Sequence, residues 1–145
     1  MNPVIIGLVA VLLTVSTPAS ARNEYKEFSI ADAMASEKIK SRLGDEVKFY
    51  FGDSRPAKTL KTIGEWPSLK KTNAFNKSDE FACQWALLSA LLSLKKRALS
   101  EGGNAVLVKT NNDHRVKSSA SVFECEIGNV VASVALLGKV IKADY

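Results

Sequence analysis

The feature that most constrains the fold is a long segment without charge near the middle of the chain. Its 14 residues, 81–94, contain no Asp, Glu, Lys or Arg, and their apolar side chains recur every three or four positions, as in an amphipathic α-helix. Two apolar rows together cover more than half of the helix circumference, so we expect the helix to be packed on more than one side. The first row comprises Phe81, Trp85, Leu88 and Leu92, and the second comprises Cys83, Leu87, Leu91, Leu94 and Ala98.

Both ends of this helix carry typical termination signals. Ser78 is a favourable N-cap, and Asp79 and Glu80 follow it in the first turn, where the helix dipole favours negative charge. The basic residues 95–97 complement the carboxyl end, and the glycines at 102–103 stop the helix. The pattern therefore predicts a helix over residues 78–101. Its uncharged part is shorter than the roughly 20 residues of a membrane span, which favours a buried helix.

Short alternating or apolar runs around this helix predict β-strands. A shorter helix is predicted to begin at an N-cap, Ser29, and to end at Gly44. Together these elements predict an α+β fold: an antiparallel or mixed sheet of about four strands packed on one long central helix, plus a short N-terminal helix. The polar residues 22–28 are predicted to lack regular structure. The predicted strands are 46–51, 58–63 (a short edge strand before the breakers Gly64 and Pro67), 105–108, 119–127 and 130–141, the last bent at Gly138.

The first 21 residues have the form of a secretory signal peptide. Residues 4–15 are a 12-residue apolar run, no charged side chain precedes Arg22, and residues 19–21 supply the small side chains of a cleavage site. An uncleaved anchor is the alternative, although 12 helical residues reach only about 18 Å of the roughly 30 Å hydrocarbon core. We therefore predict a signal peptide at residues 1–21 and a single exported domain at residues 22–145, periplasmic or secreted.

The two cysteines of the chain, Cys83 and Cys125, are predicted to form a disulfide. Export places both in an oxidising compartment, where a pair of cysteines is most simply explained as one bridge. Two buried free thiols and a redox-active pair are the alternatives, but the C-x-x-C spacing of catalytic dithiols is absent. The bridge would tie the start of the long helix to a later strand.

Motifs for common catalytic and cofactor chemistry are absent from the sequence. It contains no phosphate-binding glycine loop and no G-x-S-x-G elbow around a serine. The single histidine, His114, lies in a predicted polar turn, without a second histidine or an acid–cysteine cluster to complete a metal site. We therefore predict no catalytic, cofactor-binding or metal-binding residue.

Basic residues outnumber acidic ones by 20 to 15, which leaves a formal charge of +5. Lys70, Lys71 and Lys77 form one candidate positive patch, and residues 95–97 form another. Export argues against nucleic acid as a partner, whereas an anionic lipid or envelope polymer is compatible with this charge. Solubility alone is the simpler explanation of the same excess.

Several short motifs, spread over most of residues 22–145, resemble a family of small exported bacterial proteins. Members often carry the label "excinuclease ATPase subunit", which this sequence contradicts because it has no ATP-binding loop and no zinc-finger cysteine spacing. More distantly, the helix followed by residues 103–106 and a closing hairpin is similar to the YbjQ-like fold and to the Rcs envelope-stress sensor lipoprotein. This chain lacks the lipid-attachment cysteine of that sensor. The matching residues are 47–52, 71–75, 82–86, 103–106, 123–125, 128 and 134–136.

We therefore expect a non-catalytic periplasmic or envelope domain that acts by binding, in envelope stress or as an accessory to another envelope component. Contacts are expected from residues 54–76 or 111–118, because binding residues concentrate in irregular segments on a stiff scaffold. Trp66 and Phe75 either pack on the rim of the domain or offer a ligand-stacking surface. The alternatives are an envelope enzyme with an unrecognised active site, which needs converging titratable groups in a pocket, and oligomer formation through the apolar strand 130–141.

Overall fold

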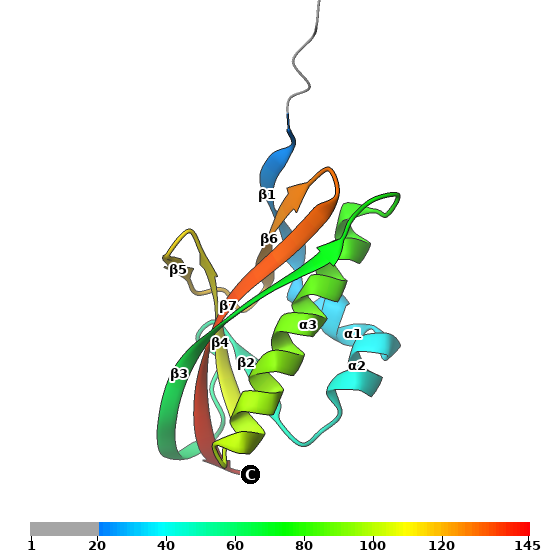
Figure 1. Cartoon of the computed structure of the whole chain (residues 1–145). Coiled ribbons are helices and arrows are strands. Elements are labelled where there is room, and N and C mark those ends of the chain that lie inside the picture. The colour runs from blue at the N-terminus through cyan, green and yellow to red at the C-terminus, as the bar shows by residue number, and fades with distance from the viewer. Residues whose placement is uncertain (1–20) are drawn as a thin grey trace, which may run out of the picture.

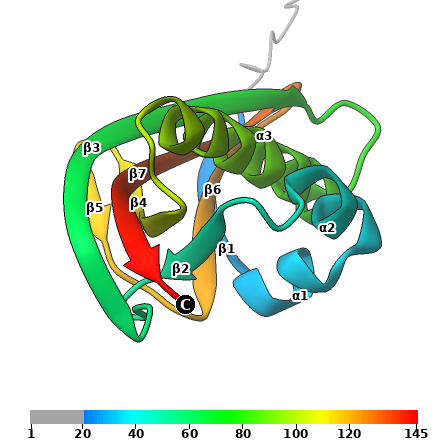
Figure 2. The same cartoon turned by 90° about the horizontal axis from the view of Figure 1, so that it is seen from below.

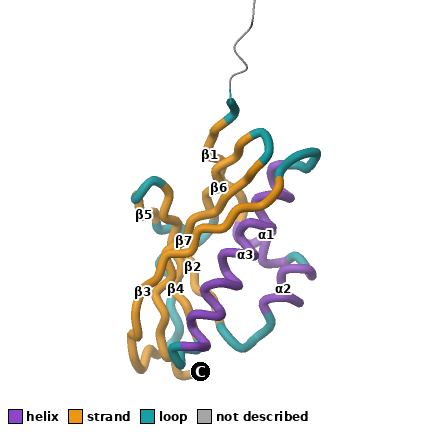
Figure 3. Tube along the Cα trace, viewed as in Figure 1, coloured by secondary structure: helices purple, strands orange, loops and turns teal. Residues whose placement is uncertain are grey.

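The computed structural model describes residues 21–145, which form one mixed seven-stranded sheet and three α-helices (Figure 1). The predicted signal peptide, residues 1–21, lies outside the described residues apart from Ala21. The helices gather on one side of the sheet (Figure 3). In chain order the elements are β1 (Asn23–Ser29), α1 (Ile30–Ala35), α2 (Glu37–Leu43), β2 (Lys48–Phe51), β3 (Lys58–Asn73), α3 (Asp79–Ser100), β4 (Ala105–Asn112), β5 (Arg115–Lys117), β6 (Val122–Gly128) and β7 (Val131–Asp144).

The sheet is built around β7, which pairs along both of its edges. β3 runs antiparallel along one edge of β7, while β4 and β6 share the other edge. β1 extends the sheet beyond β6, and both β2 and β5 pair with β4. Within residues 21–145 only the β2–β4 pair is parallel. Because both edges of β7 are occupied, this apolar strand has no free edge at which a second copy of the chain could pair.

The prediction of about four strands packed on a central helix is wrong. The sheet has seven strands, and the one long helix lies against it. β1 is among the unpredicted strands: its residues are polar, but its backbone pairs with β6 along its whole length of seven residues. Phe28 packs on Phe123 of β6, with ring centroids 5.9 Å apart. Pairing with a neighbouring strand, which local polarity does not reveal, therefore determines this element.

β3 is far longer than the predicted strand at residues 58–63. It runs for 16 residues and passes through Gly64 and Pro67. Pro67 is tolerated because β3 pairs only with β7; alternate N–H groups of an edge strand point away from the sheet, where a missing donor breaks no pair. Gly64 is required by its neighbour, since a Cβ at this position would lie 2.5 Å from Cη2 of the Trp66 indole.

The predicted N-terminal helix is divided in two at Ser36. Ser29 caps α1 as predicted, because its hydroxyl accepts a hydrogen bond from the Asp32 N–H at 3.1 Å. Ser36 has extended backbone angles (φ −61°, ψ 123°), so the first helix stops there and α2 begins at the next residue. Gly44 ends α2 as predicted, with φ 61°, a left-handed conformation that glycine adopts without strain.

α3 confirms the predicted long helix. It spans 22 residues, and the Ser78 hydroxyl accepts a hydrogen bond from the Phe81 N–H at 3.2 Å. The helix is packed on two sides: β3 curves around one side, and α1 and α2 lie on the other (Figure 2). Phe81, from the first predicted row, is instead 44% exposed. The buried residues of α3 are Ala82, Cys83, Ala86, Leu87, Leu88, Ala90, Leu91, Leu94 and Ala98.

Close packing between α3 and β7 explains Gly138, the residue predicted to bend the last strand. β7 continues without interruption through this glycine. A Cβ at Gly138 would lie 2.6 Å from a Cδ atom of Leu94 and 3.0 Å from Cγ1 of Val106. Gly138 therefore allows the helix to approach the sheet closely.

Candidate functional site

A cavity of about 300 Å³ lies on the face of the sheet that is opposite α3. Successive side chains of a strand point to opposite faces. Because Cys125 and Val134 belong to the core beneath α3, their neighbours Glu126 and Ala135 project to the other face. We call this cavity the open-face cleft; it is lined by the polar residues Tyr25, Asn111, Asn112, Asp113, His114 and Glu126 over an apolar floor that includes Pro67, Leu69 and Ala135.

The cleft brings together the two segments that the sequence singles out for binding. Segment 54–76 contributes residues 67–69, which belong to β3, and segment 111–118 contributes residues 111–114, at the turn between β4 and β5. The contributed residues, 67–69 and 111–114, lie more than 40 positions apart in the chain. They meet because β3 and β4 both pair with β7, one on each edge.

The turn between β4 and β5 has two residues with positive φ at its tip. Asp113 and His114 both have positive φ, 49° and 59°, the pattern of a two-residue hairpin turn that Asp tolerates better than most residues. The turn places Asp113 beside β1, where the Tyr25 hydroxyl donates a hydrogen bond to Asp113 Oδ2 at 2.8 Å. This hydrogen bond, assisted by partial burial, raises the pKa of Tyr25 to about 12.

Buried polar side chains hold two carboxylates of β6 in place beside the cleft. Asn112 Nδ2 donates to Glu124 Oε1 at 3.0 Å, and the Ser133 hydroxyl donates to Glu126 Oε2 at 3.4 Å. Both Asn112 and Ser133 are buried. Because their donors come from other strands, the carboxylates are oriented by tertiary contacts and do not swing freely with solvent.

The cleft is acidic although the chain is basic. Asp113 and Glu126 each contribute one negative charge, and neither Lys nor Arg lines the cleft. Glu126 makes no ion pair within residues 21–145, and Arg115 approaches Asp113 only to 4.0 Å. The local charge is therefore opposite in sign to the net charge of +5.

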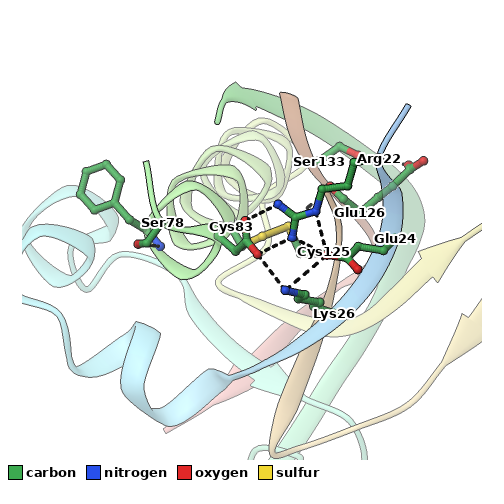
Figure 4. The surroundings of a disulfide bond; sticks show 10 residues. Arg22, Glu24, Lys26, Ser78, Cys83, Cys125, Glu126 and Ser133 are labelled. Carbon is green, nitrogen blue, oxygen red and sulfur yellow. Dashed lines mark hydrogen bonds and ion pairs between the residues drawn. A yellow bond between two sulfur atoms is a disulfide. The ribbon is translucent and has the colours of Figure 1, made fainter. Parts of the chain in front are cut away.

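The predicted disulfide is confirmed: Cys83 of α3 is bonded to Cys125 of β6 (Figure 4). Both cysteines are fully buried, and their Cα atoms are 5.9 Å apart. The bond joins the helix to the strand that carries Glu126. It thereby fixes the sheet face that forms the cleft relative to the helical layer behind it.

An ion cluster lies next to the disulfide, between β1 and the first residue of α3 (Figure 4). Arg22 and Lys26 both pair with the Asp79 carboxylate, at 2.6 and 2.9 Å, and both also pair with Glu24. The hydrogen bond from Arg22, followed by that from Lys26, lowers the pKa of Asp79 to about 2. The cluster anchors β1, and hence Tyr25, to the helix.

The other residues proposed for binding from the sequence lie away from the cleft. Trp66 is half-buried, with the Arg97 guanidinium 5.4 Å from its ring centroid, whereas Phe75 is 60% exposed. Lys95 donates to the Leu43 carbonyl at 2.7 Å and pairs with Glu46, so it has a structural role. Neither basic patch lines the acidic cleft, because no Lys or Arg is among the residues that line it.

Sequence reasoning missed Tyr25 and Glu126. Tyr25 belongs to the segment predicted to lack regular structure, so nothing assigned it to a face. Glu126 lies on the polar side of the predicted strand 119–127, and that alternation was the only signal available for it.

Within residues 21–145 no group of three or more His, Cys, Asp and Glu side chains is arranged to hold a metal ion. Among the helices of the same residues, none has both the length and the apolar character of a membrane span. No protein-family model, no curated protein and no solved structure matches the chain. The resemblances described from sequence motifs therefore stay predictions.

Proposed function

We propose that the chain is an exported, non-catalytic domain that acts by binding, and that the open-face cleft is its binding site. The observation that carries the proposal is the convergence of two exposed segments on one cavity around the hydrogen-bonded pair Tyr25–Asp113. The β4–β5 turn is a loop on a stiff scaffold, where binding residues are commonly found, and β3 supplies the adjacent floor of the cavity. Here the scaffold is the sheet, held to α3 by the disulfide.

The cleft gathers the kind of titratable groups that the envelope-enzyme alternative requires, namely Tyr25, Asp113, His114 and Glu126. We favour binding because the Tyr25 hydroxyl is already engaged by Asp113. A general acid or base works best when its pKa lies near the working pH. The Tyr25 hydroxyl has its pKa raised to about 12 by its hydrogen bond to Asp113, so at neutral pH it remains a protonated donor. In this state it acts as a hydrogen-bond donor that holds the Asp113 carboxylate in place.

The charge and floor of the cleft favour a ligand with a positive group beside an apolar one. Asp113 and Glu126 supply acceptors without a lining cation, and Leu69 and Ala135 supply apolar surface. Leu69 is 57% exposed, so it is available to a ligand. A lysine or arginine side chain of an envelope partner has this combination of apolar stem and charged tip.

Export is supported by the disulfide and by the leader pattern. Structural disulfides persist in oxidising compartments and are rare in the cytosol of most organisms. The apolar run followed by small residues before Arg22 is typical of a secretory signal.

The proposal is tested by a photo-crosslinking amino acid placed at Leu69 of the full chain in intact cells. Leu60 is the matched control, because it lies on the same strand and is 55% exposed against 57% for Leu69, but does not line the cleft. We expect a discrete adduct from position 69 and none from position 60. Equal labelling at the two positions, or none at either, contradicts the proposed site.

A charge variant separates binding from catalysis. Glu126→Gln keeps the size of the side chain and removes the charge, so we expect the adduct at position 69 to weaken several-fold. If the protein instead turns over a substrate in a hydrolase panel, and Glu126→Gln abolishes that turnover, the envelope-enzyme alternative replaces this proposal.

A further inference from the structure

A second surface, independent of the open-face cleft, lies at the free edge of β2. A cavity of about 670 Å³, larger than the open-face cleft, separates this strand from the α1–α2 pair. We call it the β2 groove; Met34, Ser41, Leu43, Val47 and Phe49 line it, with charged residues at its rim. Such a volume is within the range of natural ligand sites.

The backbone of β2 leaves hydrogen-bonding groups unpaired toward this groove. The Lys48 N–H donates to the carbonyl of Asn104, just before β4, at 3.0 Å, and the Gly52 N–H donates to the Val108 carbonyl of β4 at 3.1 Å. In a parallel pair the residues between such positions direct their backbone groups to the opposite side. The backbone N–H and C=O groups of Phe49 and Phe51 therefore point to the free edge of β2; of the two residues, Phe49 lines the groove and Phe51 lies just beyond it. The Phe51 carbonyl accepts the Ser54 N–H at 3.1 Å, which leaves the N–H groups of both phenylalanines and the Phe49 carbonyl for a partner.

The free edges of β3 and β1 carry several features that oppose pairing, and the edge of β2 carries fewer of them. β3 carries Pro67 and four lysines, and β1 carries charged residues that belong to ion pairs. Lysines, prolines and inward-held charges are the features that blunt sheet edges. β5 has three residues, all exposed. β2, with the sequence Lys-Phe-Tyr-Phe, is also short and carries one lysine, but it has no proline and its edge opens onto a cavity.

The geometry points to a docking site for an extended segment of another polypeptide, which would add to the sheet as the strand beyond β2. Strand addition of this kind uses main-chain hydrogen bonds for affinity and pockets for alternate side chains for specificity. In the β2 groove the partly buried apolar side chains of Met34 and Phe49 provide such a pocket.

The charge of the rim indicates the composition of that segment. Glu37 and Asp45 oppose Lys40 and Lys48, so the charges that line the groove cancel. An uncharged segment with apolar residues at alternate positions is therefore complementary to the groove. This ligand class differs from the cationic ligand of the open-face cleft, so either site stands if the other fails.

The test uses nuclear magnetic resonance on the folded, disulfide-bonded domain and a capped peptide of alternating threonine and valine as the probe. On binding we expect slower hydrogen exchange at the Phe49 and Phe51 amides, with no change along the free edge of β3. Two further probes carry N-methyl groups, one on all threonines and one on all valines. Because only one of these sets faces β2, their affinities should differ about tenfold or more.

A matched pair of variants locates the binding. Ser41 and Ser100 are both exposed on helices, and each hydroxyl donates to the carbonyl three residues earlier. Ser41→Trp fills the β2 groove and should abolish the exchange protection, whereas Ser100→Trp should leave it unchanged.

Three outcomes overturn the assignment. The first is no protection at Phe49 and Phe51 with any probe, and the second is equal affinity of the two methylated peptides. The third is a dimer, seen by light scattering without peptide, that Ser41→Trp converts to a monomer; this result assigns the groove to a second copy of the chain.

Discussion

Cys83 and Cys125 join the first turns of the long helix to the middle of β6 across a sequence separation of 42 residues. Both residues are fully buried, and the strand that carries Cys125 also carries Glu126, whose side chain points to the opposite face and into the open-face cleft. The covalent link between the two layers therefore reaches the candidate binding site through a single peptide bond.

Replacing both cysteines, Cys83→Ala with Cys125→Ala, is expected to lower the free energy of unfolding by up to about 4 kcal/mol. The reason is the release of a closed loop in the unfolded chain, whose entropy grows with loop length. Urea unfolding followed by circular dichroism measures the change. As a control, the wild-type protein unfolded without reductant should expose no reactive thiol. Two titratable thiols, or an unchanged unfolding midpoint, contradict this expectation.

Asp79→Asn is expected to destabilise the protein at neutral pH but not near pH 2. The pKa of Asp79 is lowered from 3.8 to about 2 in the folded state, so its stabilising contribution is complete above about pH 4 and is lost as the pH falls through 2. Because the ion cluster is partly exposed and screened by solvent, we expect Asp79→Asn to lower the free energy of unfolding at neutral pH by about 1 kcal/mol. Unfolding curves at several pH values measure it. Asp45→Asn is the control, since Asp45 forms no ion pair in residues 21–145; a difference that persists at pH 2 refutes the assignment.

Asp113→Ala is expected to lower the pKa of Tyr25 from about 12 toward its ordinary value of 10.0, because the hydrogen bond to Asp113 is the largest cause of the shift. Tyr50→Phe and Tyr145→Phe leave Tyr25 as the only tyrosine, so ultraviolet absorbance reports its ionisation alone. Asp45→Ala in the same background should not change the titration. Identical curves for the two alanine variants would show that Tyr25 and Asp113 do not interact in solution.

Gly138→Ala is expected to lower the free energy of unfolding by about 1–3 kcal/mol, as overpacking of a core does. The added Cβ would lie 2.6 Å from a Cδ atom of Leu94. A double-mutant cycle with Leu94→Ala tests the cause, because removing the Leu94 side chain relieves the contact. The loss of unfolding free energy caused by Gly138→Ala should therefore be clearly smaller in the Leu94→Ala protein than in the wild type. Additive effects would place the strain elsewhere.

The strands show how far local pattern reaches. β6 and β7 follow their predicted runs because both bury one face against the helix. A strand with a buried face shows alternating apolar residues or a continuous apolar run in its sequence. β1 shows no such pattern, because Glu24, Lys26 and Glu27 occupy both of its faces. Lys26 pairs with Asp79 of α3 and Glu27 pairs with Lys117 of β5, whereas Glu24 pairs locally with Arg22 and Lys26. β3 likewise tolerates Pro67 because it lies at an edge.

Local sequence by itself determined α3, its Ser78 cap, the Ser29 cap of α1 and the pairing of Cys83 with Cys125, because helix periodicity and capping act over a few residues and two cysteines allow one intramolecular bridge. Only the tertiary structure decided that the sheet has seven strands, that β3 is long and that Tyr25, Asp113 and Glu126 share a cleft. Those features depend on which strands pair, and pairing joins residues far apart in the chain through backbone groups that every residue carries.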